Sequence, residues 1–136
     1  MQLMIPVAVG ELFDKISILE IKQERITDEN KLKYVNTELC LLKKVVNDSL
    51  INVDKSLYDE LKAVNERLWD TEDLIREKEE SESFDEELVR LARADAIFND
   101  KRFLVKKKIN EYCGSSIIEQ KSYKDSVLNK HQNFDG

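Results

Sequence analysis

Glycine and proline are scarce in this sequence of 136 residues, which contains three glycines and one proline. Average usage would give roughly nine or ten glycines and about seven prolines at this length. A β-sandwich or β-barrel needs a turn about every ten residues, and a nucleotide-binding α/β domain needs a glycine-rich loop. The shortage therefore excludes these fold classes, together with functions that depend on phosphate-cradling loops or glycine-hinged lids.

Histidine and cysteine are also scarce. The single histidine, His131, lies in a polar C-terminal stretch, so the sequence offers no histidine-based metal site and no Ser–His or Cys–His catalytic pair. Cys40 and Cys113 are 73 positions apart, which is not a metal-ligand spacing, and both fall in helical stretches. We expect both to be reduced packing residues of a cytoplasmic protein. The sequence predicts no catalytic residue, no metal and no cofactor.

Long apolar runs are missing as well. No stretch approaches the ~18 consecutive apolar residues that a membrane-spanning helix needs. The apolar opening MQLMIPVAVG has no basic residues before it and no small-residue cleavage site, so we do not expect a secretory signal. The net charge of −6 disfavours wholesale binding to nucleic acid or anionic lipid. We therefore expect a soluble protein with no membrane partner.

Charge is abundant, at 37% of the residues, and it surrounds apolar residues at helical spacing. Apolar residues recur in steps of three and four in four segments, residues 10–27, 29–47, 54–81 and 85–113. The clearest apolar stripe is Leu32, Val35, Leu39, Leu42 and Val46.

Cap residues and short connections organise these helices into a bundle. Asp54 suits the N-cap of the third helix, Ser83 or Asp85 suits that of the fourth, and Gly114 suits the end of the fourth. Short connections place successive helices antiparallel. We therefore predict an all-α fold, an elongated antiparallel bundle of about four helices. The bundle forms a single domain over residues 1–123, followed by a short non-helical tail that is mobile over 124–136.

The length of the last helix favours self-association. A continuous helix over 85–113 would be about 43 Å long at 1.5 Å per residue. A compact chain of this size has a diameter of roughly 37 Å. An elongated bundle or a broken helix would resolve the mismatch, and so would a helix end that packs against another chain. We favour the last solution and predict a homodimer. The heptad stripe of residues 29–47 is, separately, typical of a coiled coil.

Two charged residues interrupt the apolar stripe of the last helix. Asp95 and Arg102 are seven apart, so they face the same way two turns apart, with Asn99 between them. A charge at a core position costs several kcal/mol unless it is paired. One interpretation is a buried polar network that fixes the register of the helices. The other is a polar pocket for a small anionic ligand, with Arg93 and Asp100 at its rim.

Acidic residues concentrate in the middle of the chain. Residues 54–87 hold 14 acidic and 5 basic groups. Solvent-exposed helix faces account for this acidic excess, so it needs no functional explanation. Carboxylate pairs at 11–14 and 77–80 have a spacing found in Mg²⁺-dependent all-α nucleotide pyrophosphohydrolases. Such pairs arise by chance in a chain with 28 acidic residues, so we predict no metal site.

A basic run in the last helix is a weak candidate for phosphate binding. Lys106, Lys107 and Lys108 lie near Lys101 and Arg102 in sequence. Three consecutive lysines spread over about 300° of the helix circumference, so they cannot serve one surface. We predict that nucleic acid is not a partner.

Several separated motifs occur together in this chain. They are Gly10 to Lys22, Leu68-Trp69 with Glu72-Asp73 and Ile75-Arg76, Leu91 to Arg93, Asn99-Asp100 with Arg102, Lys106 to Asn110, and Gly114-Ser115 with Ile117, Glu119 and Lys121 to Tyr123. In this order they resemble a family of small, uncharacterised α-helical proteins of bacteria and their viruses. The resemblance covers roughly residues 7–123 and implies an all-α domain, with no established activity.

Two functional hypotheses follow from these patterns. The first is a non-enzymatic scaffold or protein–protein interaction module, dimeric, with an unknown protein partner. The second is a bundle that binds a phosphate-containing small molecule, or acts on it, at a polar core site. The candidate ligand-binding residues are Asp14, Lys15, Arg76, Arg93, Asp95, Asn99, Asp100 and Arg102.

Overall fold

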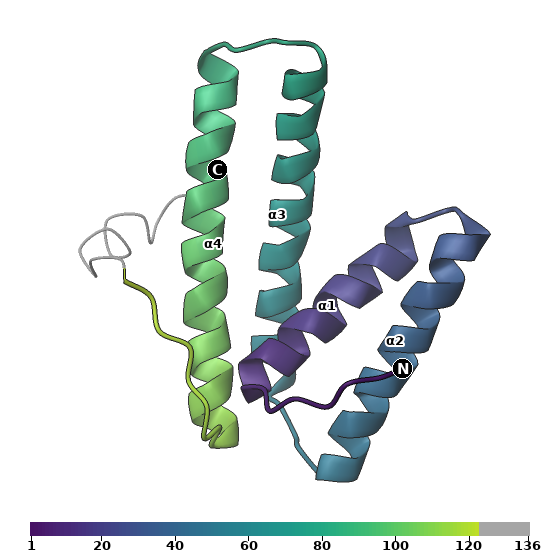
Figure 1. Cartoon of the computed structure of the whole chain (residues 1–136). Helices are drawn as coiled ribbons and strands as arrows, with labels where there is room; N and C mark the ends of the chain where they lie inside the picture. Colours follow the sequence, from purple (N-terminus) through teal and green to yellow (C-terminus); the bar gives the residue numbers. More distant parts are fainter. Residues whose placement is uncertain (123–136) are drawn as a thin grey trace. The chain divides into compact units, whose positions relative to one another are not determined.

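A computed structural model describes residues 1–122, which form four α-helices and contain no β-strand (Figure 1). The prediction of an all-α fold is confirmed, and each helix boundary lies within two residues of its predicted position. The predicted mobile segment, 124–136, lies outside the described residues. The helices are α1 (Val9–Arg25), α2 (Glu29–Ser49), α3 (Lys55–Glu80) and α4 (Glu86–Cys113).

Three of the helices begin at an aspartate that caps the first turn. The Oδ1 atoms of Asp28, Asp54 and Asp85 accept hydrogen bonds of 2.9, 2.7 and 3.0 Å from backbone N–H groups two or three residues later. Asp54 caps α3, as predicted. Of the two predicted candidates for α4, Asp85 rather than Ser83 is the cap. Gly114 follows α4 with a φ of +67°, as expected for a helix-terminating glycine.

The described chain divides into two compact units, and each is described by itself. Unit 1 comprises Met1–Lys62 and Val105–Glu119, and unit 2 comprises Ala63–Leu104 with residues 120–122. Helices α3 and α4 each contribute one part to unit 1 and the other part to unit 2. The expectation of a single domain stays a prediction.

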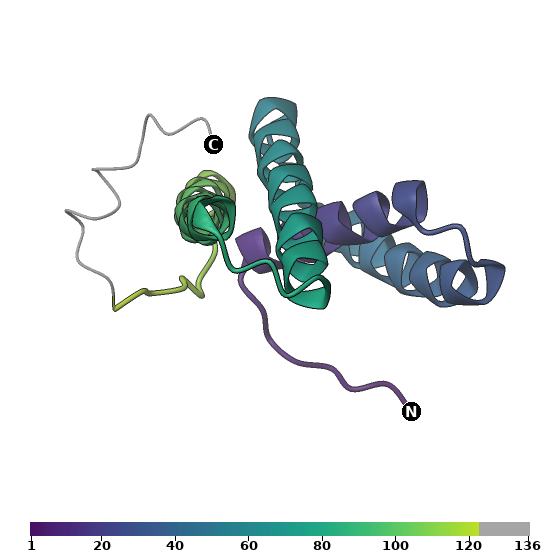
Figure 2. The ribbon, with the colours of Figure 1, turned by 90° about the horizontal axis from the view of Figure 1, so that it is seen from above.

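Unit 1 contains the larger apolar core, built around α1. This helix runs alongside α2, as both ribbon views show (Figures 1 and 2). Each large apolar side chain removed from water contributes roughly 1.5–3 kcal/mol, so this cluster is the main source of stability in unit 1. Its buried members are Leu12, Phe13, Ile16, Leu19, Val35, Leu39, Leu61, Val105 and Ile109.

Unit 2 has a smaller apolar core. Leu68 from α3 packs against Ala94 and Phe98 from α4, with Val64 partly buried beside them. The guanidinium of Arg67 lies 4.7 Å from the centre of the Phe98 ring, a cation–π geometry that covers the edge of this core. This contact adds to the apolar packing of α3 against α4 in unit 2.

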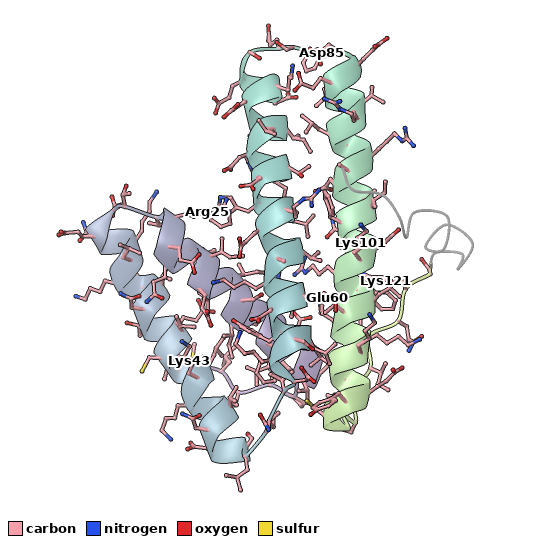
Figure 3. All side chains as sticks on the ribbon, turned by 180° about the vertical axis from the view of Figure 1, so that it is seen from behind. Arg25, Lys43, Glu60, Asp85, Lys101 and Lys121 are labelled. Carbon is pink, nitrogen blue, oxygen red and sulfur yellow. The ribbon has the colours of Figure 1, made fainter. Side chains whose placement is uncertain are left out.

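Charged side chains project from all four helices, as the labelled Arg25, Lys43, Glu60 and Lys101 illustrate (Figure 3). Cys40 is exposed on α2, so the prediction that it is a packing residue is wrong. Cys113 is half-buried, and burial raises the pKa of its thiol.

No helix in the described part of the chain is long and apolar enough to span a membrane.

Candidate functional site

Three segments of unit 1 meet around the ammonium group of Lys106 on α4. Its Nζ donates a 2.6 Å hydrogen bond to Glu11 Oε2, and lies 3.8 Å from Asp14 Oδ2 and 3.6 Å from Glu119 Oε1. The Lys106 side chain is only 8% exposed and Asp14 is fully buried. A buried charge needs partners, and the ammonium of Lys106 is one partner of the buried Asp14. We call this group of residues the Lys106 junction.

Residues at the end of α4 and just after it also cap the start of α1. Ala8, at the N-cap position of α1, has no side chain that could accept a hydrogen bond. Asn110 Oδ1 instead accepts a 2.6 Å hydrogen bond from the backbone nitrogen of Gly10, and Ser115 Oγ accepts a 3.2 Å hydrogen bond from that of Val9. Three of the motifs that carry the family resemblance therefore meet at one place in unit 1.

Gly10 is required at this junction by space rather than by its backbone angles. A Cβ atom at this position would lie 2.5 Å from the backbone oxygen of Lys106 and 3.0 Å from Asn110 Oδ1. The absence of a side chain therefore lets α1 approach the unit 1 part of α4 closely. Since the groups described here bind one another, we interpret the junction as structural.

Lys15, the other predicted ligand residue in unit 1, is exposed. Its Nζ lies 3.7 Å from Glu38 Oε1 on α2, and both side chains are about half exposed. An ion pair of this kind contributes at most about 1 kcal/mol. Lys15 thus contributes to the pairing of α1 with α2.

Asp95 occupies the polar seam of unit 2, where the sequence predicts a departure from the apolar pattern. It is half-buried, and its Oδ1 atom is buried without a hydrogen-bond partner among the described residues. Asn99 Nδ2 donates to the backbone oxygen of Asp95 at 3.1 Å and approaches its Oδ2 at 3.4 Å. The asparagine thus satisfies one side of this aspartate and leaves the other without a donor.

Glu72, an exposed residue of α3, also interacts electrostatically with this seam and was not among the predicted ligand residues. The pKa of Glu72 is raised, mainly by burial and then by the neighbouring carboxylate of Asp95, while Arg76 and Arg102 act in the opposite direction. Two carboxylates and two guanidiniums are therefore close enough to influence one another in unit 2. The remaining two predicted residues lie on α4, where Arg93 is exposed and Asp100 is half-buried.

Unit 1 also contains an open groove of about 350 Å³, which we call the apolar groove. Its apolar lining comes from α1, α2 and the connection to α3, and two lysines, Lys43 and Lys55, stand at its rim. These lysine side chains are 54% and 86% exposed. The lining residues are Phe13, Ile16, Glu20, Lys43, Val46, Asn47, Val53, Lys55 and Tyr58.

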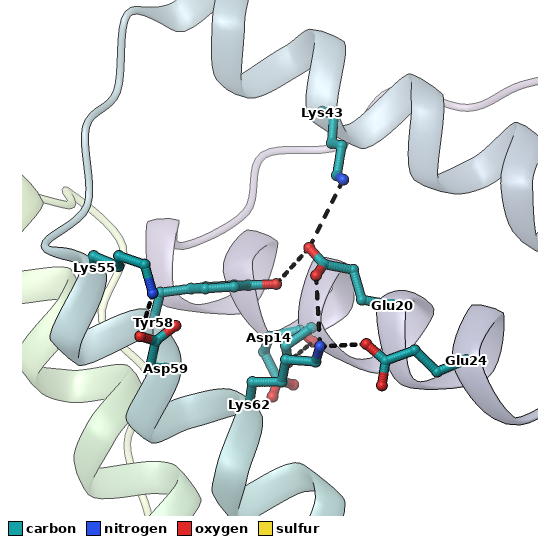
Figure 4. A network of polar contacts seen from close by, with 9 residues as sticks. Asp14, Glu20, Glu24, Lys43, Lys55, Tyr58, Asp59 and Lys62 are labelled. Carbon is teal, nitrogen blue, oxygen red and sulfur yellow. Dashed lines mark hydrogen bonds and ion pairs between the residues drawn. The ribbon is translucent and has the colours of Figure 1, made fainter.

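A polar network fixes one wall of the groove (Figure 4). The hydroxyl of Tyr58 donates a 2.7 Å hydrogen bond to Glu20 Oε1, which also lies 3.8 Å from Lys43 Nζ. Lys62 Nζ lies 3.8 Å from Glu20 Oε2 and donates to Glu24 Oε1 at 2.5 Å. Burial, with help from the hydrogen bond to Glu20, raises the pKa of the Tyr58 hydroxyl far above its ordinary range, so this side chain stays neutral.

No pattern in the sequence indicates this groove. Glu20 and Tyr58 stand 38 positions apart, and no spacing rule connects a glutamate on one helix with a tyrosine on a later one. No group of three or more aspartate, glutamate, histidine or cysteine residues within 1–122 is placed to hold a metal ion.

These features define a small all-α protein with a polar junction and an open groove in one unit and a polar seam in the other. The chain belongs to a family of unknown function (DUF6165), whose model matches residues 3–135. Membership agrees with the predicted resemblance to an uncharacterised family and assigns no activity.

The chain is also similar to a short part of a much longer curated protein. The sequence is 32% identical over 126 residues to the DNA-directed RNA polymerase subunit beta of Ureaplasma urealyticum serovar 10, and equally to that of Ureaplasma parvum serovar 3. The alignment covers 91% of this chain but 9% of each subunit. No solved structure matches. So small a share of a polymerase subunit carries no activity over to this chain.

Proposed function

We propose that this protein is a non-enzymatic interaction module whose apolar groove binds an acidic protein segment with an apolar anchor residue. The observation that carries the proposal is the combination of an apolar floor with two exposed lysines at the rim. Interfaces typically bury a few apolar anchors in a pocket and surround them with polar contacts.

The dimensions of the groove suit such an anchor. Its volume lies near the lower end of the roughly 300–1,000 Å³ typical of ligand pockets. Phe13 and Tyr58 pack edge to face, with ring centres 6.2 Å apart, and the Tyr58 hydroxyl is held by Glu20. A wall that is already ordered lowers the entropic cost of binding.

The charges of the rim favour an acidic partner. Lys43 contacts Glu20 only at 3.8 Å, and Lys55 pairs with Asp59 on the exposed face of α3. Exposed ion pairs of this kind contribute at most about 1 kcal/mol, so carboxylates of a partner can compete for both lysines.

Calorimetric titration of the full chain tests this proposal. The probe is a short peptide with one phenylalanine between glutamates. We expect saturable binding that weakens with salt, and an affinity at least about tenfold lower in the double variant Lys43→Glu/Lys55→Glu. The matched control is Lys31→Glu/Lys33→Glu, which makes the same charge change on exposed residues of α2 outside the groove. Equal affinity in the two double variants would overturn the proposal.

A second candidate function is ligand binding at the polar seam of unit 2. It is supported by the buried Oδ1 of Asp95, which accepts no hydrogen bond among the described residues. A hydroxyl of a sugar phosphate could donate to this atom while the guanidinium of Arg102 meets the phosphate. A thermal-shift screen of nucleotides and sugar phosphates should then raise the melting temperature of the full chain, and not that of Arg102→Leu. No stabilisation by any of these compounds would remove the candidate.

A further inference from the structure

We infer that the segment that fills the apolar groove is the tip of the α3–α4 hairpin of a second copy of this chain. The inference rests on the proposed function of the groove and names its occupant. The hairpin tip is residues 77–87, the end of α3, the turn and the start of α4.

The tip has the charge that the groove requires. It carries seven acidic side chains and one basic one, so its net charge of −6 equals that of the whole chain. The groove lining contains two lysines and one glutamate. The acidic members of the tip are Glu77, Glu79, Glu80, Glu82, Asp85, Glu86 and Glu87.

The tip also has the apolar anchor. Phe84 lies in the turn, between acidic residues, and is 67% exposed. Val89 is exposed one turn further along α4. Transfer of a phenylalanine from water into an apolar site is among the larger contributions that one side chain makes to an interface. An exposed phenylalanine amid carboxylates is the chemical complement of an apolar floor flanked by lysines.

Hydrogen bonds and ion pairs hold the tip in one conformation. Lys78 Nζ lies 2.9 Å from Asp85 Oδ2 and 2.8 Å from Glu87 Oε2, which links the end of α3 to the start of α4. The backbone nitrogen of Ser83 donates to the carbonyl of Lys78 at 2.9 Å, and Glu82 adopts a φ of +52°, the arrangement that closes a helix C-terminus. Phe84 is thus presented without the cost of ordering a flexible loop.

The two complementary surfaces are different, so each contact joins the tip of one copy to the groove of another. Two copies close into a dimer when each inserts its tip into the groove of the other, and they form larger assemblies when they do not. In both cases the same contact forms, with Phe84 of one copy against the floor around Val46 and Val53 of the next.

Photo-crosslinking tests the contact directly. p-Benzoylphenylalanine is introduced in place of Phe84 in the full chain, and equal amounts of ¹⁴N- and ¹⁵N-labelled protein are mixed before irradiation. We expect crosslinked peptides that join position 84 to the segment containing Val46 or Val53, about half of them with mixed isotopes. Crosslinks that are absent, that map outside the groove, or that never mix isotopes would overturn the inference.

Sedimentation equilibrium with a charge swap provides the second test. Phe84→Ser should weaken self-association at least about tenfold, whereas Tyr34→Ser, which removes another exposed aromatic residue, should leave it unchanged. The tip variant Glu82→Lys/Glu86→Lys and the groove variant Lys43→Glu/Lys55→Glu should each associate weakly alone and recover on mixing. Failure to recover would count against the pairing.

The proposed function of the groove and the identity of its occupant can fail separately. If the acidic phenylalanine peptide binds the groove but the full chain sediments as a monomer, the second copy is not the occupant and the groove function stands. If the peptide does not bind and the charge swap has no effect, both the function and the occupant are wrong.

Discussion

The side-chain oxygen of Asn110 accepts a 2.6 Å hydrogen bond from the backbone nitrogen of Gly10, one hundred residues earlier in the chain. This contact satisfies one of the free N–H groups at the start of α1 with a group from the end of α4. Because both groups are buried, removal of the end of α4 would leave this N–H group of α1 without its acceptor. The Lys106 junction therefore links the start of α1 to the end of α4 within unit 1.

Substitution of Gly10 by alanine should destabilise the protein, although alanine is the better helix former. The new Cβ would lie 2.5 Å from the carbonyl oxygen of Lys106, and overpacking of this kind costs typically 1–3 kcal/mol. The gain in helix propensity offsets no more than about 1 kcal/mol. Urea unfolding should show a net loss of about 1–2 kcal/mol, and an unchanged midpoint would contradict the described packing.

Substitution of Leu50 by glycine should stabilise the protein. Leu50 follows α2 with a φ of +57° and is almost fully exposed. Its left-handed conformation therefore costs free energy that burial of the side chain does not offset. Relief of this strain should raise the free energy of unfolding by about 0.5–1 kcal/mol. The control is Ser49→Gly, at the last helical position, which should lower it. A similar response of both variants would show that the left-handed conformation is not the cause.

Removal of the Tyr58 hydroxyl should weaken the wall of the groove. Tyr58→Phe keeps the ring against Phe13 but loses the 2.7 Å hydrogen bond to Glu20. A partly buried hydrogen bond to a charged acceptor is worth about 1–2 kcal/mol, and chemical denaturation should report a loss of that size. Tyr34→Phe, at an exposed tyrosine, should leave stability unchanged. Equal effects at both positions would show that the hydrogen bond from Tyr58 to Glu20 does not stabilise the protein.

Glu72 should make the stability of unit 2 depend on pH in an unusual direction. Its pKa is raised in the folded state by burial and by Asp95, against the opposing charges of Arg76 and Arg102. Ionisation of Glu72 therefore costs stability above its folded pKa, and this cost disappears as the pH falls below the ordinary value of about 4.5. Glu72→Gln should be more stable than the wild type at pH 7 and equal to it at low pH.

Asp85 provides a control of opposite sign for that experiment. The hydrogen bonds from Lys78 and from the backbone of Leu88 lower the pKa of Asp85. Its contribution is therefore present above the ordinary pKa near 3.8 and is lost only as the pH falls through the lowered value. Asp85→Asn should be less stable than the wild type at pH 7, and the difference should vanish in strong acid. Thermal unfolding followed from pH 8 down into strong acid, below the lowered pKa of Asp85, checks both variants.

The helices could be predicted because local physics fixes them. Apolar residues at three- and four-residue spacing, together with Asp54, Asp85 and Gly114 at the ends, specify the boundaries without tertiary contacts. The anomaly at Asp95 was visible for the same reason, since it interrupts a periodic stripe.

The junction and the groove could not be predicted because both depend on tertiary packing. No local rule indicates that Asn110 accepts a hydrogen bond from Gly10, or that Tyr58 donates one to Glu20. The misplacement of Cys40 has a related origin, since a helical position alone does not say which face of α2 is covered.

The most direct test of the central claim is methyl NMR of the full chain with labelled valine and isoleucine, titrated with the acidic phenylalanine peptide. Binding in the apolar groove predicts that the methyl signals of Ile16, Val46 and Val53 shift in a saturable manner, and that the shifts are lost in Lys43→Glu/Lys55→Glu. Signals that stay in place at saturating peptide, or that shift only at valines and isoleucines outside the groove, would contradict the account.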